Sequence, residues 1–181
     1  MLAAACHPAA SSPAQPEATT SGVDEVLSSV CLPFVRDSLP EAVVARRAKL
    51  RPGSEQTGSL SGPFYIGQLY LAAAGVSRLR LNGDQVIPAP GLVSRALCSF
   101  TPQRKPDVWM TELADFMLRE KFTSSPAPVE PLLGKAMSGL ELACSSQQPR
   151  VWLATWAEGE ETVVALGRAP AFSGLCVGAP E

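Results

Sequence analysis

The chain has 181 residues, of which 46% are hydrophobic and 18% are charged. This composition can build a core, so a chain that is disordered throughout is excluded. The formal net charge is -2 and there is no long basic run, so a nucleic-acid partner is not expected. No apolar run reaches the ~20 residues that a membrane-spanning helix needs.

The first 21 residues predict a leader followed by a flexible tether. Residues 2–6, LAAAC, resemble a bacterial lipobox, in which small residues precede a cysteine that is lipidated after signal cleavage. By this resemblance Cys6 is the lipidation site, and His7 in the next position favours the outer membrane. Residues 7–21 have almost no apolar bulk and cannot repay the entropy of ordering. Because a secretory signal also needs a basic region, which the five residues before Cys6 lack, an untargeted tail is the alternative.

Residues 20–40 are the first segment with a helical pattern. Ser21 is expected to cap the helix, and Asp24 and Glu25 lie in its first turn, at the positive end of the dipole. Pro33 lacks an N–H for the carbonyl four residues earlier, so it predicts a kink or an end. One buried face is predicted from the spacing of Val23, Val26, Leu27, Val30, Cys31 and Phe34. Cys31 is expected either as a buried thiol or in a disulfide with a strand beneath the helix.

Residues 40–50 predict a second, shorter helix with Pro40 in its first turn. Cations gather at its end: Arg46, Arg47, Lys49 and Arg51. Arg46 and Arg47 are candidate surface contacts for an acidic partner or lipid head groups. The alternative is that the cations only stabilise the negative end of the helix. Breaker residues then predict a loop over residues 52–63.

The middle of the chain predicts strands at residues 64–72, 77–82 and 93–100. In the second strand Leu79 and Leu81 alternate with Arg78 and Arg80, which is typical of a strand with one buried and one solvated face. A long helix is predicted at residues 106–122. Its expected buried stripe consists of Val108, Trp109, Leu113, Phe116 and Met117.

Three strands, at residues 140–145, 151–157 and 162–168, are expected to close the fold. Trp152 and Trp156 share one strand face. They are interpreted either as a lid under which the long helix packs or as an exposed aromatic platform for a sugar or a peptide.

The order of elements predicts an α+β fold: a mostly antiparallel sheet with two N-terminal helices and one long central helix packed on one face. We expect a single domain over residues 22–170, followed by a C-terminal tail at residues 171–181.

Cysteine usage bears on the compartment. Apart from Cys6 the chain has Cys31, Cys98, Cys144 and Cys176, and an even number in an exported domain predicts two disulfides in one of three connectivities. We favour Cys31–Cys98 with Cys144–Cys176, because this pairing links each half of the domain internally. The alternative is four buried free thiols in a cytoplasmic protein. A zinc site is not expected, because no C-x-x-C motif is present.

No catalytic residue, cofactor or metal is predicted. The only histidine, His7, lies in the predicted tether, which removes machinery that needs a histidine base. No P-loop, nucleophile elbow or dinucleotide motif occurs. Carboxylates are densest at Glu158, Glu160 and Glu161, where a solvated hairpin tip is the simpler interpretation.

Residues 28–122 resemble small secreted or lipid-anchored proteins of unassigned function from alphaproteobacteria. The resemblance rests on the run VCLPF at residues 30–34, the basic helix ending ARRAKL, the strand that carries Cys98, and the long helix after it. It implies export and nothing about activity.

These features favour a non-enzymatic lipoprotein of the bacterial outer membrane that faces the periplasm and acts as a binding or assembly module. Its expected partners are an envelope protein, the membrane through a lipid anchor on Cys6, or the other subunits of a larger membrane complex. Such a module predicts an exposed apolar or aromatic patch. The alternative is a soluble, cytoplasmic enzyme or enzyme accessory that uses carboxylates or a free thiol.

Overall fold

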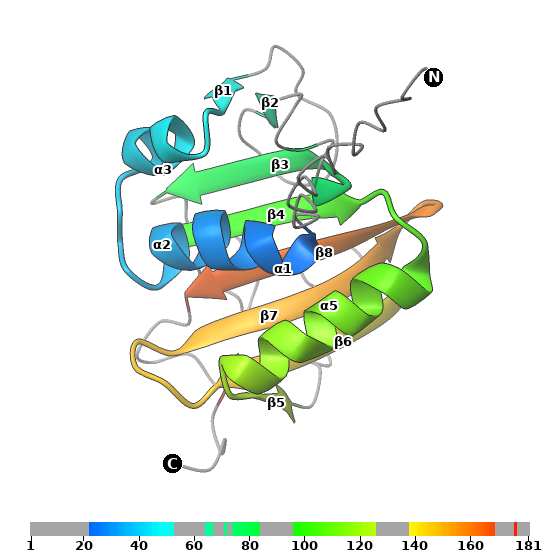
Figure 1. Cartoon of the computed structure of the whole chain (residues 1–181). Coiled ribbons are helices and arrows are strands. Elements are labelled where there is room, and N and C mark those ends of the chain that lie inside the picture. The colour runs from blue at the N-terminus through cyan, green and yellow to red at the C-terminus, as the bar shows by residue number, and fades with distance from the viewer. Residues whose placement is uncertain are drawn as a thin grey trace, which may run out of the picture.

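A computed structural model describes residues 22–52, 64–66, 71, 74–83, 96–125, 138–168 and 176 (Figure 1). In this part of the chain an antiparallel sheet has the strand order β1-β2-β3-β4-β8-β7-β6-β5. Its larger part comprises β3 (Val76–Gly83), β4 (Ala96–Pro102), β5 (Phe122–Ser125), β6 (Ser138–Ser145), β7 (Val151–Glu158) and β8 (Glu161–Arg168). The short strands β1 (Arg51–Pro52) and β2 (Phe64–Ile66) extend the sheet beyond β3. The predicted α+β class is confirmed.

The first helical run crosses the sheet as α1 (Val23–Val26), the π-helical segment η1 (Leu27–Cys31) and α2 (Leu32–Val35). The run ends two residues after Pro33, close to where the proline predicts an end. The Leu32 N–H donates to the Leu27 carbonyl, five residues back, so the turn before the proline is wider than an α-turn. The wider turn relieves the contact between the proline ring and the carbonyl four residues earlier.

Both ends of this run are capped by side chains from distant elements. At the N-terminus the Glu112 carboxylate accepts a hydrogen bond from the Val23 N–H at 2.7 Å. The predicted cap, Ser21, lies outside the described residues. At the C-terminus the Arg168 guanidinium donates to the Val35 carbonyl at 2.8 Å. Long-range contacts therefore supply a cap at each end of the run.

The short helix α3 (Glu41–Arg47) ends in a tight, hydrogen-bonded turn. The Leu50 N–H donates to the Ala45 carbonyl at 2.7 Å, and the Lys49 N–H donates to the Arg46 carbonyl at 3.1 Å. Lys49 has a φ of +54°, and Leu50 is buried. This is a Schellman motif, which turns the chain out of the helix and into β1.

The long helix α5 (Pro106–Arg119) buries Trp109, Leu113 and Phe116, as predicted. It is shorter than expected, because Lys121 takes a φ of +57° and Phe122 begins the edge strand β5. Val108 was placed on the buried side but is 41% exposed.

The strand predicted at residues 64–72 is the clearest error in the fold. The strand β2 stops at Ile66, and Leu71 has a helical backbone. The apolar run in this region has no alternation, and a short apolar run does not distinguish a strand from a buried helical turn.

The sheet is buried on both faces. One face, here called the helix face, packs under α1–α2 and α5 (Figure 1) and includes Leu81, Cys98, Phe100, Leu153, Val164 and Leu166. The opposite face, here called the tryptophan face, includes Leu97, Leu142, Cys144, Trp152, Ala154, Trp156, Val163 and Ala165. Every residue from Val151 to Trp156 is buried, which is typical of a strand covered on both sides.

One disulfide lies on each face. Cys31 of η1 is bonded to Cys98 of β4, which ties the first helical run to the centre of the sheet. Cys144 of β6 is bonded to Cys176, which ties the C-terminal part of the chain to the tryptophan face. Both predicted pairings are confirmed, and the alternative of four free thiols is wrong. Two disulfides are typical of oxidising, extracytoplasmic compartments.

Candidate interaction surface

Two carboxylates at α5, Glu112 and Glu120, are engaged in structural contacts. Glu112 pairs with Arg104 at 3.0 Å and also caps the first helical run. Glu120 pairs with Arg36 at 2.9 Å. These carboxylates hold the first helical run against α5, so their geometry has a structural explanation that requires no catalytic role.

Asp24 links the same two helical elements. Its carboxylate accepts a hydrogen bond from Arg119 Nη1 at 2.9 Å and another from Ser28 Oγ at 3.0 Å. The hydrogen bond from Arg119 is the main reason that the pKa of Asp24 lies below its ordinary value. The charged form of Asp24 is therefore favoured in the folded protein.

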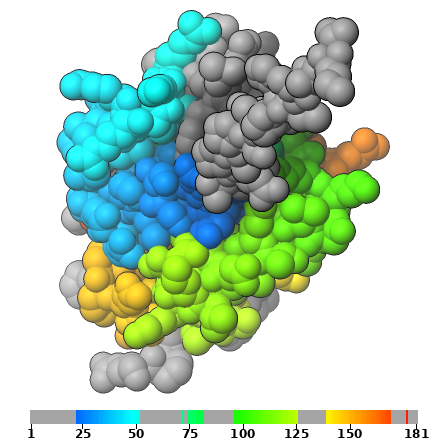
Figure 2. Space-filling model, in the orientation of Figure 1, coloured from blue at the N-terminus to red at the C-terminus, as the bar shows by residue number. Residues whose placement is uncertain are grey.

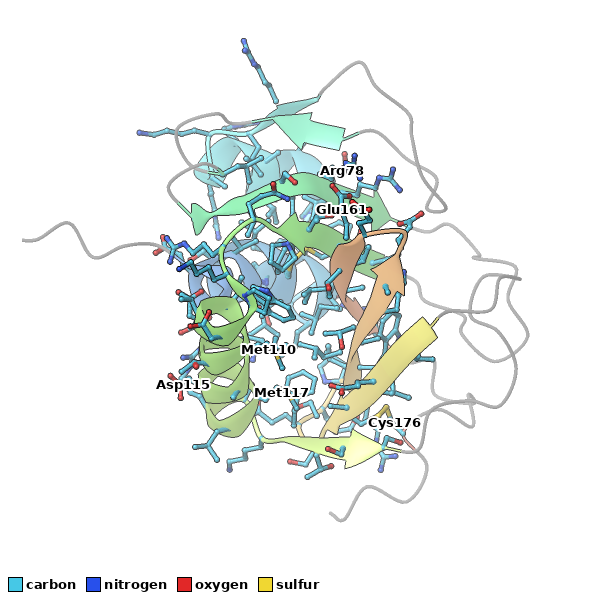
Figure 3. All side chains as sticks on the ribbon, turned by 90° about the vertical axis from the view of Figure 1, so that its right-hand side faces the viewer. Arg78, Met110, Asp115, Met117, Glu161 and Cys176 are labelled. Atoms are coloured by element: carbon cyan, nitrogen blue, oxygen red, sulfur yellow. A yellow bond between two sulfur atoms is a disulfide. The ribbon has the colours of Figure 1, made fainter. Side chains whose placement is uncertain are left out.

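The hairpin that carries the densest carboxylates is a solvent-facing turn. Gly159, with a φ of +65°, sits in the two-residue connection between β7 and β8. Glu160 is exposed, and Glu161 pairs with Arg78 of β3 (Figure 3). The Arg78–Glu161 pair therefore links β8 to β3, which lies on the other side of β4.

The thiol chemistry of the alternative hypothesis is not available at the described cysteines. Cys31, Cys98, Cys144 and Cys176 are all in disulfides and are buried. Within the described ranges, no group of three or more His, Cys, Asp and Glu side chains is placed to hold a metal ion. Nor does any helix in this part of the chain have the length and hydropathy to cross a membrane.

The tryptophan pair does not form the surface that the sequence suggested. Trp152 and Trp156 are each 3% exposed, so neither is an open platform. They also lie on the face opposite α5, so they are not the lid beneath it. The Trp152 indole lies over Gly167 of β8, where an added Cβ would stand 2.2 Å from the ring. The tryptophans are therefore core residues of the second sheet face.

Arg80 also departs from the prediction of a solvated strand face. It is 5% exposed and lies beside Ser99 of β4. Burial lowers the pKa of Arg80, and the Glu158 carboxylate opposes this shift by favouring the charged form. The alternation of leucine and arginine in β3 is correct, and Arg78 is exposed as predicted, but the second face is covered at Arg80.

The exposed large apolar side chains of the described residues gather on α5. Val108, Met110 and Leu118 are 41%, 53% and 81% exposed. Met110, Ala114 and Leu118 recur every four residues and therefore follow one line on the helix surface. Met117 borders this line and packs partly against the core. We call Met110, Ala114, Met117 and Leu118 the α5 ridge.

The α5 ridge faces away from the first helical run. Glu112 and Arg119 of α5 contact α1, whereas helical geometry places Met110 and Met117 on the other flank. Asp107 and Asp115 are exposed on the outer surface of the same helix, and Asp115 points away from the sheet in Figure 3. The ridge is thus an apolar line with acidic residues along its outer side.

The other predicted surface contacts are exposed. Arg46 and Arg47 lie in the last turn of α3, followed by exposed Lys49 and Arg51. The structure does not bring them near the tryptophans, which lie within the sheet core. Cys6 and His7 lie outside the described residues, so the expected lipidation site has no structural description.

Only the buried stripe of this helix, with Met117 in it, was predicted from the sequence, so the α5 ridge was not. A helix of fourteen residues that buries only Trp109, Leu113 and Phe116 leaves its other apolar side chains outside. Plotting positions 110, 114 and 118 on the helix would have revealed a second apolar line.

No protein-family model matches the chain, and neither the curated proteins nor the solved structures contain a match.

Proposed function

We propose that the protein is a non-enzymatic binding module of the bacterial envelope, held at the outer membrane by lipid on Cys6 and facing the periplasm. The two disulfides support export, because such bonds persist in oxidising compartments. The lipobox-like sequence before Cys6 supports the anchor. A subunit of a larger membrane complex would have the same features.

The observation that carries the binding role is the α5 ridge. Leu118 is 81% exposed, and methionine side chains adapt their shape to different partners. An apolar helix line with a four-residue repeat fits a hydrophobic groove on a partner protein. Asp107 and Asp115 favour a groove whose rim carries lysine or arginine.

The anchor and the disulfides are tested by the intact mass of the protein from native membranes, before and after reduction and alkylation. We expect acyl mass on Cys6 and four thiols that react only after reduction. An unmodified chain that begins at Met1 would overturn the lipoprotein proposal. Thiols that react before reduction would overturn the disulfide assignment.

The ridge is tested by placing a photo-crosslinking residue at position 118 or 110 in cells, with position 160 on the β7–β8 hairpin as the matched control. We expect one protein adduct from the two ridge positions and none from position 160. Leu118→Asp should remove the adduct formed from position 110 without changing the unfolding midpoint. Equal adducts from all three positions would contradict the proposal, and a dimer of this chain as the only adduct would replace the partner with a second copy.

A further inference from the structure

The cations at the end of α3 form a surface that the proposed binding role does not use. Arg46 and Arg47 close the helix, Lys49 occupies the turn, and Arg51 begins β1; all four side chains are exposed. We call these four residues the basic corner. Figure 2 shows α3 and β1 in cyan at the upper-left outline of the molecule, away from α5 in green.

The basic corner is held in a defined conformation. The Schellman motif fixes the backbone from Ala45 to Leu50 by two hydrogen bonds, and the Leu50 side chain is anchored in the core. Arg51 pairs with Ile66 of β2 in the sheet register. The four charges are therefore presented together on a rigid turn, unlike the charges of a flexible basic tail.

No carboxylate among the described residues pairs with the positive charges of the basic corner. Arg36, Arg78, Arg104 and Arg119 each pair with a carboxylate, and Arg168 caps α2. None of the four corner residues has an ion pair or a side-chain hydrogen bond with a described residue. The only acidic residue of α3, Glu41, lies in the first turn, at the opposite end of the helix.

Stabilisation of the helix dipole explains only half of this cluster. The dipole effect acts within the last turn, which contains Arg46 and Arg47. Lys49 lies beyond that turn, and Arg51 lies in a strand. A cluster that extends past the helix and stays unpaired therefore favours an external anion.

We infer that the basic corner rests on the anionic head groups of a phospholipid membrane. The corner projects at the edge of the molecule, and a projecting surface fits a flat partner better than a small ligand, which needs a concave site. Guanidinium groups bind phosphate through two parallel hydrogen bonds, and three of the four cations are arginines. The inference rests on the proposed envelope location, but it requires neither the acyl chain nor the α5 ridge.

The test measures binding of the full chain to vesicles of pure phosphatidylcholine and to vesicles with about one-third phosphatidylglycerol. The chain carries Cys6→Ser, so an acyl anchor cannot contribute to binding. We expect binding only to the anionic vesicles, with about a 25-fold loss in Arg46→Gln/Arg47→Gln, since each cation contributes about fivefold. Raising the salt from about 0.01 M to about 0.15 M shortens the Debye length from about 30 Å to about 8 Å and should weaken binding.

The matched control is Lys105→Gln/Lys121→Gln, which removes the same charge from exposed lysines at the two ends of α5. Binding of this control should equal that of the parent chain. Equal loss in both double variants, or equal binding to both kinds of vesicle, would overturn the inference. If polyglutamate binds through Arg46 and Arg47 while anionic vesicles do not, the corner recognises an acidic protein and the membrane assignment is wrong. These outcomes leave the crosslinking test of the α5 ridge unaffected.

Discussion

The two faces of the sheet are closed in different ways. The helix face is covered by α1–α2 and α5, whose contacts include the Glu112 cap and the pairs Asp24–Arg119 and Arg36–Glu120. The tryptophan face has no described helix over it, and its core contains Trp152, Trp156 and the Cys144–Cys176 disulfide. Each face has one disulfide; the helix face adds helix packing and charge contacts, and the tryptophan face adds large aromatic side chains.

The contacts on the two faces illustrate two ways of holding a segment of the chain against a sheet. Ion pairs and caps act between elements that are already ordered, and each contributes little where it is exposed. A disulfide acts mainly by restricting the unfolded chain, so it can hold a segment that has few other contacts. On the tryptophan face Cys176 is buried and bonded to Cys144, and Arg150 Nη1 donates to its carbonyl at 2.6 Å.

The largest effect on stability is expected from removing the two disulfides one at a time. Loss of Cys31–Cys98, which closes a 67-residue separation, should cost about 4.4 kcal/mol of unfolding free energy, from the chain-entropy relation. Loss of Cys144–Cys176, with a separation of 32, should cost about 3.7 kcal/mol by the same relation. The measurement is urea unfolding of the two Cys→Ser double variants.

Tryptophan fluorescence then shows which face of the sheet each disulfide stabilises. The Cys144→Ser/Cys176→Ser variant should shift the emission of Trp152 and Trp156 to longer wavelength under native conditions. A Trp109→Phe background leaves only these two reporters, because the protein has three tryptophans. A larger shift in the Cys31→Ser/Cys98→Ser variant would contradict the assignment of one bond to each face.

Gly167 allows a sharper test of the tryptophan face. It lies opposite Trp152 in the β7–β8 register, and an added Cβ would stand 2.2 Å from the indole. Gly167→Ala should therefore destabilise the protein by about 1–3 kcal/mol through overpacking. The measurement is the change in unfolding free energy, followed by a second variant that combines Gly167→Ala with Trp152→Leu.

The double variant tests the cause of that loss. Truncating Trp152 opens space for the new methyl group, so the two changes should cost less together than the sum of their separate effects. Additive costs would mean that Gly167 matters for its backbone rather than for the indole above it.

The helix face was largely predictable from the sequence because helical periodicity records which side is buried. The spacing of Trp109, Leu113 and Phe116 identified the packed side of α5 without any structure. The order of the strands β6, β7 and β8 followed from short loops between apolar runs. The pairing of the four cysteines was a choice among three, and the sequence could not measure the separations that decide it.

The tryptophan face and the surfaces were harder to predict. The continuous apolar run at residues 151–157 was a signal for a strand buried on both sides, but it does not say what covers the second side. Arg80 was assigned to solvent by alternation alone, yet it is buried. Caps such as Glu112 and Arg168 come from distant parts of the chain, where local pattern carries no information about the contact.

A smaller effect is expected at the cap of the first helical run. Glu112→Gln keeps the shape of the side chain. It weakens the hydrogen bond that the Val23 N–H donates, and it removes the negative charge that pairs with Arg104. We expect a loss of about 0.5–2 kcal/mol in unfolding free energy, the range for an N-cap. Glu160→Gln at the exposed hairpin tip is the matched control and should have no measurable effect. Equal stability of the two variants would show that the cap contributes nothing to closing the helix face.

The smallest expected effect is the pH dependence of the Asp24–Arg119 contact. Because the pKa of Asp24 is lowered in the folded protein, its contribution is present above the ordinary value of 3.8 and is lost as pH falls through and below that value. The side chains of Arg119 and Asp24 are 47% and 35% exposed, so the contribution should stay below about 1 kcal/mol. Unfolding free energies at pH 6, 4 and 2 (about two units on either side of the ordinary pKa) should therefore fall less in Asp24→Asn than in the parent chain. Asp115→Asn, which changes an exposed carboxylate on the outer side of α5, should follow the parent curve. If Asp24→Asn also follows it, the Asp24–Arg119 contact contributes nothing to closing the helix face.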